Sequence, residues 1–357
     1  MSQLSHGGRA LSFGLVLVAA ALVLSTGNVA ASVAKWSVVS SPNVAGADNW
    51  LRAVSCTTST FCMAVGGVLP PSADEAPLSE AWNGKTVRLL SMPNPLAGAE
   101  GDADLSSVSC TSPTFCMAVG DYNSNSAGVG GGLIEQWNGT TWAMTTPLPQ
   151  GFLDGVSCVS TTFCFAVGWS AASTAEIMQW NGLSWIQVAN PAPTPFSSLG
   201  SVKCTSIDFC MAIGGIVEEW NGAVWTLDAM QSVIPDDFLA CPTSTFCMAT
   251  DTLSGIVQWN GSVWSVSTAG TSGQDIGAIS CLTPTSCMAV GDVEIANGVY
   301  RTFVEQWNGA NWTVMTSANS PRTNNGLLGV KCTSATFCMA VGYHDSSTTQ
   351  DTLVEKY

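Results

Sequence analysis

The fold of this 357-residue chain follows from one stretch, Val108-Ser109-Cys110-Thr111-Ser112-Pro113-Thr114-Phe115-Cys116-Met117-Ala118-Val119-Gly120. The stretch occurs with variation seven times, and its two cysteines, six positions apart, account for all 14 cysteines of the chain. The pairs are Cys56 with Cys62, Cys110 with Cys116, Cys158 with Cys164, Cys204 with Cys210, Cys241 with Cys247, Cys281 with Cys287 and Cys332 with Cys338. The copies follow one another at spacings of 37 to 54 residues, and such self-similarity predicts a solenoid, a propeller or an array.

Each unit predicts four antiparallel strands. Residues 105–110 and 115–120 flank a short polar turn, which favours two strands joined as a hairpin. A third strand at 133–137 leads to Asn138-Gly139, a strong hairpin signal because both residues tolerate a positive φ, and a fourth strand opens at Trp142. Four such strands per unit describe a propeller blade, so we expect an all-β, seven-bladed β-propeller.

The ends of the chain indicate how the ring closes. The Trp-Asn-Gly turn occurs six times for seven cysteine pairs, and the last unit stops at Leu353-Val354-Glu355-Lys356-Tyr357 without a fourth strand. Near the start, Lys35-Trp36-Ser37-Val38-Val39 has the sequence of a fourth strand, with Trp36 in the place of Trp142. We therefore expect residues 35–357 to form a single propeller domain in which the N-terminal strand completes the last blade.

Residues 1–34 predict a secretory signal peptide. A polar start contains Arg9, an apolar run covers 11–24, and small residues suit cleavage near position 31 or 34. The run of about 14 residues is shorter than the roughly 20 that span a bilayer, which disfavours the alternative of a membrane anchor. We expect a secreted or cell-envelope protein that is not inserted in a membrane after cleavage.

The cysteines predict disulfides within each unit. Disulfides persist in oxidising compartments, in agreement with export. The alternative, a structural zinc site, needs about four Cys or His ligands, whereas each unit offers two cysteines and the chain contains only 2 histidines. A bridge that closes so short a loop contributes about 2 kcal/mol by the chain-entropy estimate.

The excess of acidic over basic residues limits which partners the protein can bind. A formal net charge of −15 repels phosphate backbones, so neither nucleic acid nor an anionic membrane is an expected partner. An extracellular glycan or protein remains as the expected partner. We expect the protein to be a monomer without a cofactor. Calcium stays open as an alternative, because the stretches 102–104 and 236–237 are rich in the carboxylates that Ca²⁺ prefers.

The repeat resembles two groups of known proteins. Double glycines at Val65-Gly66-Gly67 and Ile213-Gly214-Gly215, with an aromatic residue before a tight turn and a second Trp after it, resemble a kelch repeat. Five units lack the double glycine, and the first aromatic is Trp rather than Tyr. The Cys-x5-Cys and Glu-Gln-Trp-Asn-Gly signatures more closely resemble repeat proteins secreted by actinobacteria. That resemblance implies the fold and the export route, but no activity.

Repeated positions outside the cysteines predict structural roles. The third position before each first cysteine holds a small residue in six units, which lets the inner strands approach the axis, and Phe238 in the fifth unit should narrow the channel. Six methionines that follow the second cysteines should pack in the core. A glutamate two residues before the turn aromatic should make a structural hydrogen bond in five units, at Glu80, Glu135, Glu218, Glu305 and Glu355.

The candidate binding surface is the face whose loops vary in length, because binding residues concentrate in variable loops on a rigid scaffold. Aromatic and acidic residues stand where strands begin or end on this face. There, rings could stack on sugars while carboxylates bind their hydroxyl groups, so we expect a non-catalytic module for a glycan or a protein. Ordinary solvated loop residues are the alternative. The candidates are Trp50, Asp104, Asp121, Tyr122, Phe152, Trp169, Asp275, Asp292 and Tyr343.

Catalysis is open but disfavoured. His344 is the single histidine after the predicted signal, and no nucleophile motif surrounds it. The alternative function is an extracellular glycoside hydrolase or lyase that uses carboxylates at the channel mouth, because this chemistry asks only for two acids about 5 to 10 Å apart. Asp104, Asp121, Asp154 and Asp292 are candidates, and no spacing favours one pair.

Overall fold

The computed structural model describes residues 35–71, 73–96, 100–124, 130–146, 149–191, 197–228, 233, 235–251, 255–267, 274–296, 298–319 and 324–357. The predicted signal peptide, residues 1–34, lies outside the described residues. From Ala34 to Tyr357 the chain forms one compact unit. No helix in these ranges is long and apolar enough to cross a bilayer.

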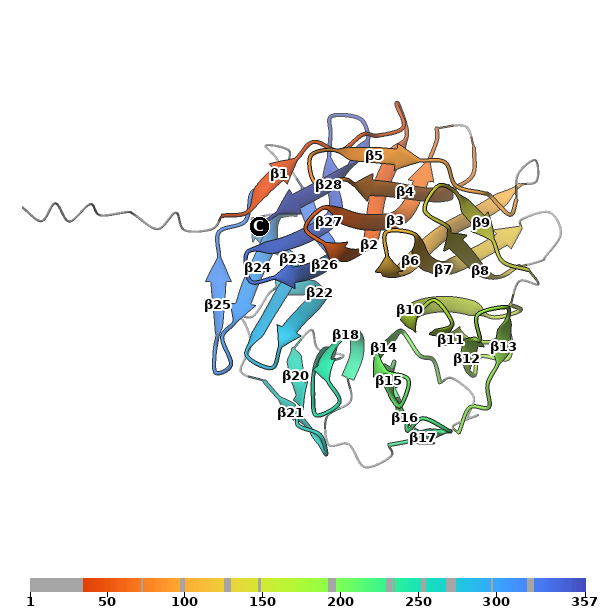
Figure 1. Cartoon of the computed structure of the whole chain (residues 1–357). Helices are drawn as coiled ribbons and strands as arrows, with labels where there is room; N and C mark the ends of the chain where they lie inside the picture. The colour runs from red at the N-terminus through yellow and green to blue at the C-terminus, as the bar shows by residue number, and fades with distance from the viewer. Residues whose placement is uncertain are drawn as a thin grey trace, which may run out of the picture. The chain divides into compact units, whose positions relative to one another are not determined.

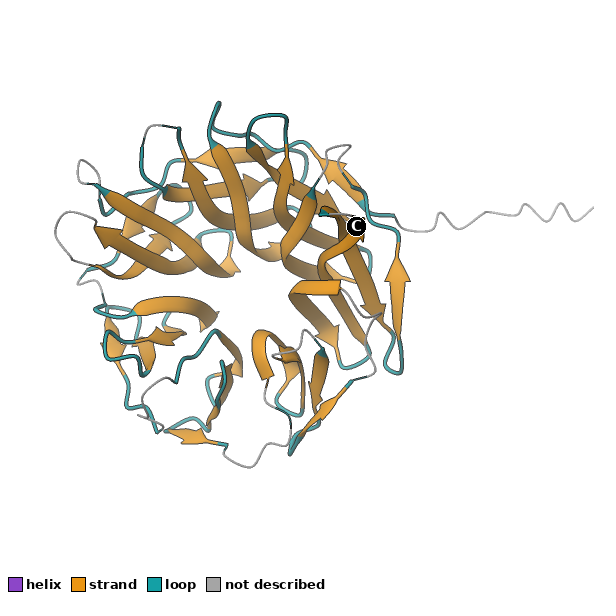
Figure 2. Cartoon of the chain, turned by 180° about the vertical axis from the view of Figure 1, so that it is seen from behind, coloured by secondary structure: helices purple, strands orange, loops and turns teal. Residues whose placement is uncertain are grey.

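Seven four-stranded antiparallel sheets are arranged in a ring, which confirms the predicted seven-bladed β-propeller (Figures 1 and 2). Each sheet is one blade, numbered here in chain order. Blade 1 consists of β2 (Asp48–Thr58), β3 (Phe61–Leu69), β4 (Ala76–Trp82) and β5 (Val87–Leu90). Blade 2 consists of β6 (Gly101–Ser112), β7 (Phe115–Ser124), β8 (Gly130–Trp137) and β9 (Trp142–Met144). Blade 3 consists of β10 (Phe152–Ser160), β11 (Phe163–Trp169), β12 (Ala175–Trp180) and β13 (Trp185–Gln187).

The remaining blades follow the same order. Blade 4 consists of β14 (Ser201–Ser206), β15 (Phe209–Ile213), β16 (Val217–Trp220) and β17 (Trp225–Leu227). Blade 5 consists of β18 (Pro235–Thr243), β19 (Phe246–Asp251), β20 (Ile256–Trp259) and β21 (Trp264–Val266). Blade 6 consists of β22 (Gln274–Thr283), β23 (Ser286–Ala296), β24 (Val299–Trp307) and β25 (Trp312–Met315). Blade 7 is β26 (Asn325–Ser334), β27 (Phe337–Asp345), β28 (Gln350–Lys356) and β1 (Ser37–Val39). The inner strands, which line the channel, are β2, β6, β10, β14, β18, β22 and β26.

The N-terminal strand closes the ring, as the sequence predicts. Strand β1 pairs antiparallel with β28, and Ser37 lies opposite Lys356 (Figure 1). Trp36 just before it is only 1% exposed, and its ring centroid lies 5.5 Å from that of Tyr357. The two ends of the domain therefore share one blade.

The hydrophobic core lies between neighbouring blades. Val54 of blade 1, for example, packs in one cluster with Met339 and Val341 of blade 7. The six methionines after the second cysteines are all buried, which confirms their predicted core role. Burying one such side chain stabilises a fold by about 1.5–3 kcal/mol, so the interfaces between blades hold the ring together.

All seven predicted disulfides are present, one in each blade, with Cα–Cα distances of 3.9 to 4.1 Å. Seven disulfides and no free cysteine suggest an oxidising, extracellular environment. The bridges join Cys56 to Cys62, Cys110 to Cys116, Cys158 to Cys164, Cys204 to Cys210, Cys241 to Cys247, Cys281 to Cys287 and Cys332 to Cys338.

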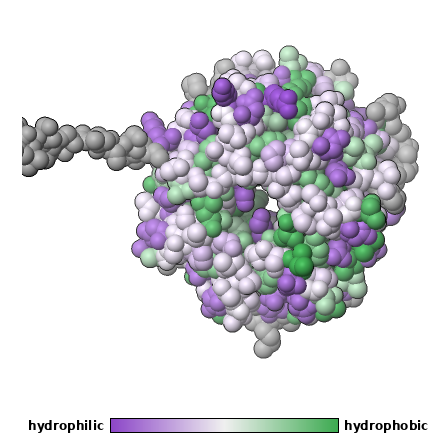
Figure 3. All heavy atoms as spheres, viewed as in Figure 1, coloured by the Kyte–Doolittle hydropathy of each residue, from purple (hydrophilic) through white to green (hydrophobic). Residues whose placement is uncertain are grey.

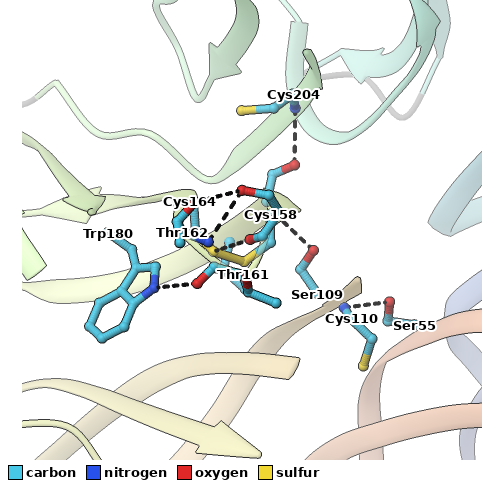
Figure 4. Close-up of a disulfide and its surroundings, with 12 residues drawn as sticks. Ser55, Ser109, Cys110, Cys158, Thr161, Thr162, Cys164, Trp180 and Cys204 are labelled. Carbon is cyan, nitrogen blue, oxygen red and sulfur yellow. Dashed lines mark hydrogen bonds between the residues drawn. A yellow bond between two sulfur atoms is a disulfide. The ribbon is translucent and has the colours of Figure 1, made fainter. Parts of the chain in front are cut away.

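One face of the ring carries all the cysteine turns and Trp-Asn-Gly turns, and we call it the stapled face. In six blades the indole Nε1 of the turn tryptophan donates to a carbonyl of the cysteine turn, as Trp180 does to Thr161 O at 3.0 Å (Figure 4). The second strand of each blade carries the second cysteine, so the disulfide and the indole together tie the first three strands at this face.

The Trp-Asn-Gly hairpins form as predicted, but their turn chemistry differs from the expectation. Trp137 pairs directly with Trp142, and the loop between them holds four residues rather than two. Gly139 alone takes the left-handed conformation, at φ +96°, whereas the side-chain Oδ1 of Asn138 accepts hydrogen bonds from the N–H groups of Thr140 and Thr141. Asparagine serves these turns through its side chain, which mimics a backbone turn.

A second set of hydrogen bonds links the blades around the channel. In blades 1, 2, 3 and 6 the residue before the first cysteine is serine. Its Oγ accepts a hydrogen bond from the backbone N–H of the first cysteine of the next blade, at 3.0 to 3.1 Å. Figure 4 shows three of these bonds in succession, from Cys110 N–H to Ser55, from Cys158 N–H to Ser109, and from Cys204 N–H to the blade before it. These bonds fix the distance between neighbouring inner strands.

The repeated glutamates divide into two kinds. Glu80 accepts from Ser41 and Thr352, and Glu355 accepts from Ser317 Oγ at 2.9 Å, which confirms a structural hydrogen bond in those blades. The prediction is wrong for Glu135 and Glu218, whose carboxyl oxygens are buried without a hydrogen-bond partner in the described part of the chain. Burial raises the pKa of Glu135 to about 8 and that of Glu218 to about 7.

Candidate functional site

A β-bulge shapes the mouth of the channel on the variable-loop face, the face opposite the stapled one. In five blades the register of the inner strand slips at the fourth position before the first cysteine, so that one extra residue opposes the partner strand. Bulges re-aim side chains and are common beside binding sites. The extra residues are Arg52, Ser106, Asp154, Gly277 and Leu328, and all five line the mouth.

The spacing of apolar residues along the sequence could have revealed these bulges. A regular strand buries alternate residues, yet Leu51 and Val54, three positions apart, are both buried. The same spacing of three recurs in five other units. With unbroken alternation along the inner strands, Asp154 was predicted only as one of several acids and Arg52 was given no role at the mouth.

The mouth encloses a cavity of about 680 Å³, which we call the mouth cavity. Two aromatic residues, three acids and one cation stand on its walls, together with small and apolar residues. In the space-filling view an opening persists at the centre of the ring, with hydrophilic residues at its edge (Figure 3). The aromatic and charged residues are Trp169, Phe238, Asp154, Asp236, Asp237 and Arg52.

Phe238 lines both the mouth cavity and the channel below it, in agreement with its predicted position. Its backbone is left-handed, at φ +53°, which is rare for a bulky residue, and the register of β18 is irregular on both sides of it. The side chain is 38% exposed. A strained backbone that presents an exposed aromatic ring to a cavity is a feature of ligand-binding sites.

Trp169 is the one member of the nine predicted binding residues that lines the mouth cavity. It lies directly opposite Phe152 in the β10–β11 ladder, and the two rings stack with centroids 4.3 Å apart and an interplanar angle of 19°. Stacking on Phe152 fixes the orientation of the indole. Blade 3 therefore presents a rigid aromatic surface to the mouth.

A second group of predicted residues lies at the boundary of blades 1 and 2. Arg52 Nε lies 2.7 Å from Asp104 Oδ2, and its guanidinium stands 6.0 Å from the centroid of the Trp50 ring. Asp121 lies opposite Asp104, and burial, followed by the charge of Asp104, raises its pKa to about 6. Burial, with Asp104 close by, raises the pKa of Glu75 to about 8, so this carboxyl group is protonated at neutral pH.

A third group joins blades 6 and 7. Asp275 and Asp292 are directly opposed, and burial, followed by the charge of Asp275, raises the pKa of Asp292 to about 6. The ring of Tyr343 covers Gly326, where a Cβ atom would lie 2.8 Å from the ring. Burial and then Asp292 raise the pKa of the Tyr343 hydroxyl. Tyr122, the remaining prediction, packs against the core of blade 2.

Eight of the nine predicted residues thus form three groups on one face rather than one site, and Tyr122 packs apart from them against the core. The mouth cavity brings together Trp169 with residues that the prediction left out of its set, namely Phe238, Asp154 and Asp237. Burial, then Asp121, Asp237 and Asp104, raises the pKa of Asp154 to about 6. Burial and then Asp236 raise the pKa of Asp237.

Within the described ranges, no three His, Cys, Asp or Glu side chains are grouped so that they could hold a metal ion. The walls of the mouth offer rings and carboxylates, which can bind apolar surfaces beside hydroxyl or amino groups.

The fold and the site define a disulfide-stapled, seven-bladed β-propeller with an open, aromatic and acidic channel mouth. No family model and no curated protein matches the sequence, so the resemblance to kelch repeats stays a prediction.

Solved structures similar to this chain are propellers. They include YCF48 bound to D1 peptide, at 11% identity and a TM-score of 0.58 over 90% of this chain and 96% of that one. The WD40 β-propeller domain of Doa1 matches at 13% identity and a TM-score of 0.59 over 90% and 97%. The GH74 enzyme of Niastella koreensis matches at 10% and 0.60 over 89% of this chain and 55% of that one. At these identities the likeness shows the fold alone.

Proposed function

We propose that the chain is a secreted, non-catalytic binding module that recognises a glycan through the mouth cavity. The observation that carries the proposal is the convergence of Trp169, Phe238 and Asp154 on one cavity of about 680 Å³. Ligand sites typically combine aromatic walls with a few placed polar groups, and this cavity has that composition. The repeated scaffold beneath it holds these groups in place.

A neutral glycan suits this chemistry better than other extracellular ligands. The apolar face of a sugar ring can stack on the indole of Trp169, which Phe152 already orients. Ionised Asp154 and Asp237 only accept hydrogen bonds, which matches the hydroxyl groups that sugars donate. A neutral ligand also meets no repulsion from a chain of net charge −15.

Glycoside hydrolysis is the second candidate, and one observation favours it. Burial, followed by the charge of Asp104, raises the pKa of Glu75 to about 8, so a protonated acid stands beside a second carboxyl group. This is the pairing that acid-assisted cleavage needs. Asp104 is, however, held by Arg52, and neither Glu75 nor Asp104 lines the mouth cavity. Binding without turnover therefore fits the described geometry better.

A glycan array tests the proposal, run with calcium and then with a chelator. We expect selective retention of the purified, disulfide-bonded protein, followed by saturable binding of the retained oligosaccharide without release of shorter products. Cleavage that Asp104→Asn or Asp121→Asn abolishes would establish the hydrolase instead. Retention that the chelator removes would support the calcium alternative. No binding to any glycan on the array, together with capture of a protein partner, would contradict the glycan proposal.

A matched pair of substitutions in blade 3 locates the binding. Trp169→Ala removes the aromatic wall of the mouth and should weaken binding at least tenfold. Leu183→Ala, in the Trp-Asn-Gly turn of the same blade, removes a side chain that is 90% exposed on the stapled face and should leave binding unchanged. Equal loss in both variants would show that the mouth cavity is not the site.

A further inference from the structure

The channel below the mouth contains two lysines where the repeat has serine. The position before the first cysteine is serine in blades 1, 2, 3 and 6, and those serines link neighbouring blades. In blades 4 and 7 the same position holds Lys203 and Lys331. A lysine has no acceptor for the N–H of the next cysteine, so these two blades lose the link and place an ammonium group in its stead.

Both lysines face the channel. Lys203 and Lys331 line a cavity of about 220 Å³ enclosed by the seven inner strands, and neither is fully buried. The charge of Lys331, followed by burial, lowers the pKa of Lys203 to about 7. Burial also lowers the pKa of Lys331. The two lysines thus share one cavity inside the ring.

Within the described inner strands, no acid stands at the level of this lysine pair. Every other charged residue of these strands lies at the bulge or further toward the variable-loop face, Asp154 and Asp237 among the nearest. The bulge precedes the lysine level by three residues, or about 10 Å of strand. The one ion pair in the described part of the chain joins Arg52 to Asp104 at the mouth. Asp154 and Asp237 line the same cavity toward the mouth, so the nearest carboxylates of these strands lie about 10 Å of strand away from the lysine pair.

Serine hydroxyl groups complete a ring of donors at the same level. Ser55, Ser109 and Ser280 line the channel beside the lysines, and each Oγ already accepts a hydrogen bond from a cysteine N–H. The hydroxyl hydrogen of each serine remains free to donate. Ammonium and hydroxyl donors that converge on an enclosed space suit an anion with several acceptor oxygens.

We propose that Lys203 and Lys331 form an anion site in the central channel, which takes a small oxyanion such as sulfate or phosphate. The anion lies between the two ammonium groups and accepts further hydrogen bonds from the serine hydroxyls. It ties blade 4 to blade 7 across the channel. This site lies below the mouth cavity, with which its cavity shares Asp154, Asp237 and Phe238, and the proposal stands whether or not the mouth binds a glycan.

Substitution to the repeat residue tests the site without opening a cavity. The double variant Lys203→Ser/Lys331→Ser restores the residue found in four other blades, so it should fold. Lys85→Ser, which removes an exposed lysine from a turn on the stapled face, is the matched control. Sulfate, and separately phosphate, is titrated against each protein in sodium chloride at constant ionic strength.

We expect sulfate to raise the Tm of the wild type and of Lys85→Ser along one saturable curve. The apparent affinity should fall at least tenfold in either single lysine variant, and the saturable rise should vanish in the double variant. An equal rise of Tm in the double variant would show general stabilisation by salt and overturn the proposal.

Trace acetylation of the wild type gives a second readout that needs no variant. Acetic anhydride reacts with neutral amines, so Lys203 should be acetylated faster than Lys85 near neutral pH. A bound oxyanion favours the ammonium form, and sulfate should therefore slow acetylation of Lys203 and Lys331 relative to Lys85 in the same sample. Rates that do not respond to sulfate would overturn the proposal even if the variants failed to fold.

Discussion

The stapled face and the variable-loop face of the ring are built from the same strands, yet they differ in how strictly they repeat. On the stapled face every blade has the same disulfide, and six blades repeat the same indole-to-carbonyl hydrogen bond at 2.9 to 3.3 Å. On the variable-loop face the bulge residue alone ranges from Arg52 through Asp154 to Leu328. Repetition marks the residues that stabilise the fold, and departures from it mark the residues available to a ligand.

The largest expected effect comes from breaking the ring that both faces share. A variant that lacks residues 35–41 loses β1 and Trp36, so blade 7 loses its outer strand. Its free energy of unfolding should fall by more than that of Trp36→Ala, for which a buried tryptophan predicts a loss of about 3–5 kcal/mol. Thermal melts compare the three proteins, and a melt unchanged by the deletion would rule out closure by the N-terminal strand.

A smaller effect is expected within the stapled face. Replacing Cys158 and Cys164 by serine removes one bridge and should lower the free energy of unfolding by about 2 kcal/mol. Because the bridge lies on the face opposite the mouth, binding at the mouth should not change. Denaturant unfolding measures the first quantity and ligand titration the second. Loss of binding at unchanged stability would reverse the roles assigned to the two faces.

Buried acids between the faces give a pH dependence. Burial raises the pKa of Glu135 from 4.5 to about 8, so the folded chain keeps a proton that the unfolded chain releases above about pH 4.5. The free energy of unfolding should therefore fall as pH rises from about 4.5 to about 8. Melts of Glu135→Gln should show a flatter dependence in this window, whereas exposed Glu100→Gln serves as the control. Identical slopes in all three proteins would contradict a buried, protonated Glu135.

The smallest effect on stability is expected at the mouth. Burial and neighbouring acids raise the pKa of Asp154 from 3.8 to about 6, so its charge destabilises the folded state increasingly from about pH 3.8 to 6 and by a constant amount above. Asp154→Asn should raise the Tm at pH 8 and leave it unchanged near pH 4. Asp208→Asn, on the exposed stapled face, should change neither melt. A lower Tm at pH 8 for Asp154→Asn would show that the carboxylate stabilises the fold instead.

The fold could be predicted from the sequence because its signals are local. Paired cysteines, Trp-Asn-Gly turns and small residues near the axis each act within one blade, and the missing turn in the last unit identified Trp36 as part of that blade. Turn chemistry was predicted less well, since the side chain of Asn138 rather than a positive φ supports the loop. Repetition of Glu135 suggested a hydrogen bond that its surroundings do not supply.

The candidate site could be predicted only in part, because it depends on relations between blades. The sequence placed Trp169 and Asp104 on the variable-loop face, but the bulges decide which side chains turn into the mouth. Lys203 and Lys331 are more than a hundred positions apart, and nothing in the sequence shows that they line the same cavity. Such pairings become visible only once the ring is closed.

Hydrogen–deuterium exchange tests most directly whether the variable-loop face binds the ligand. The oligosaccharide retained on the array is added to the intact protein, and protection is mapped peptide by peptide. We predict slower exchange around Phe152 to Asp154, Trp169 and Asp236 to Phe238, with no change in the cysteine and Trp-Asn-Gly turns. Protection confined to those turns, on the stapled face, would contradict the account.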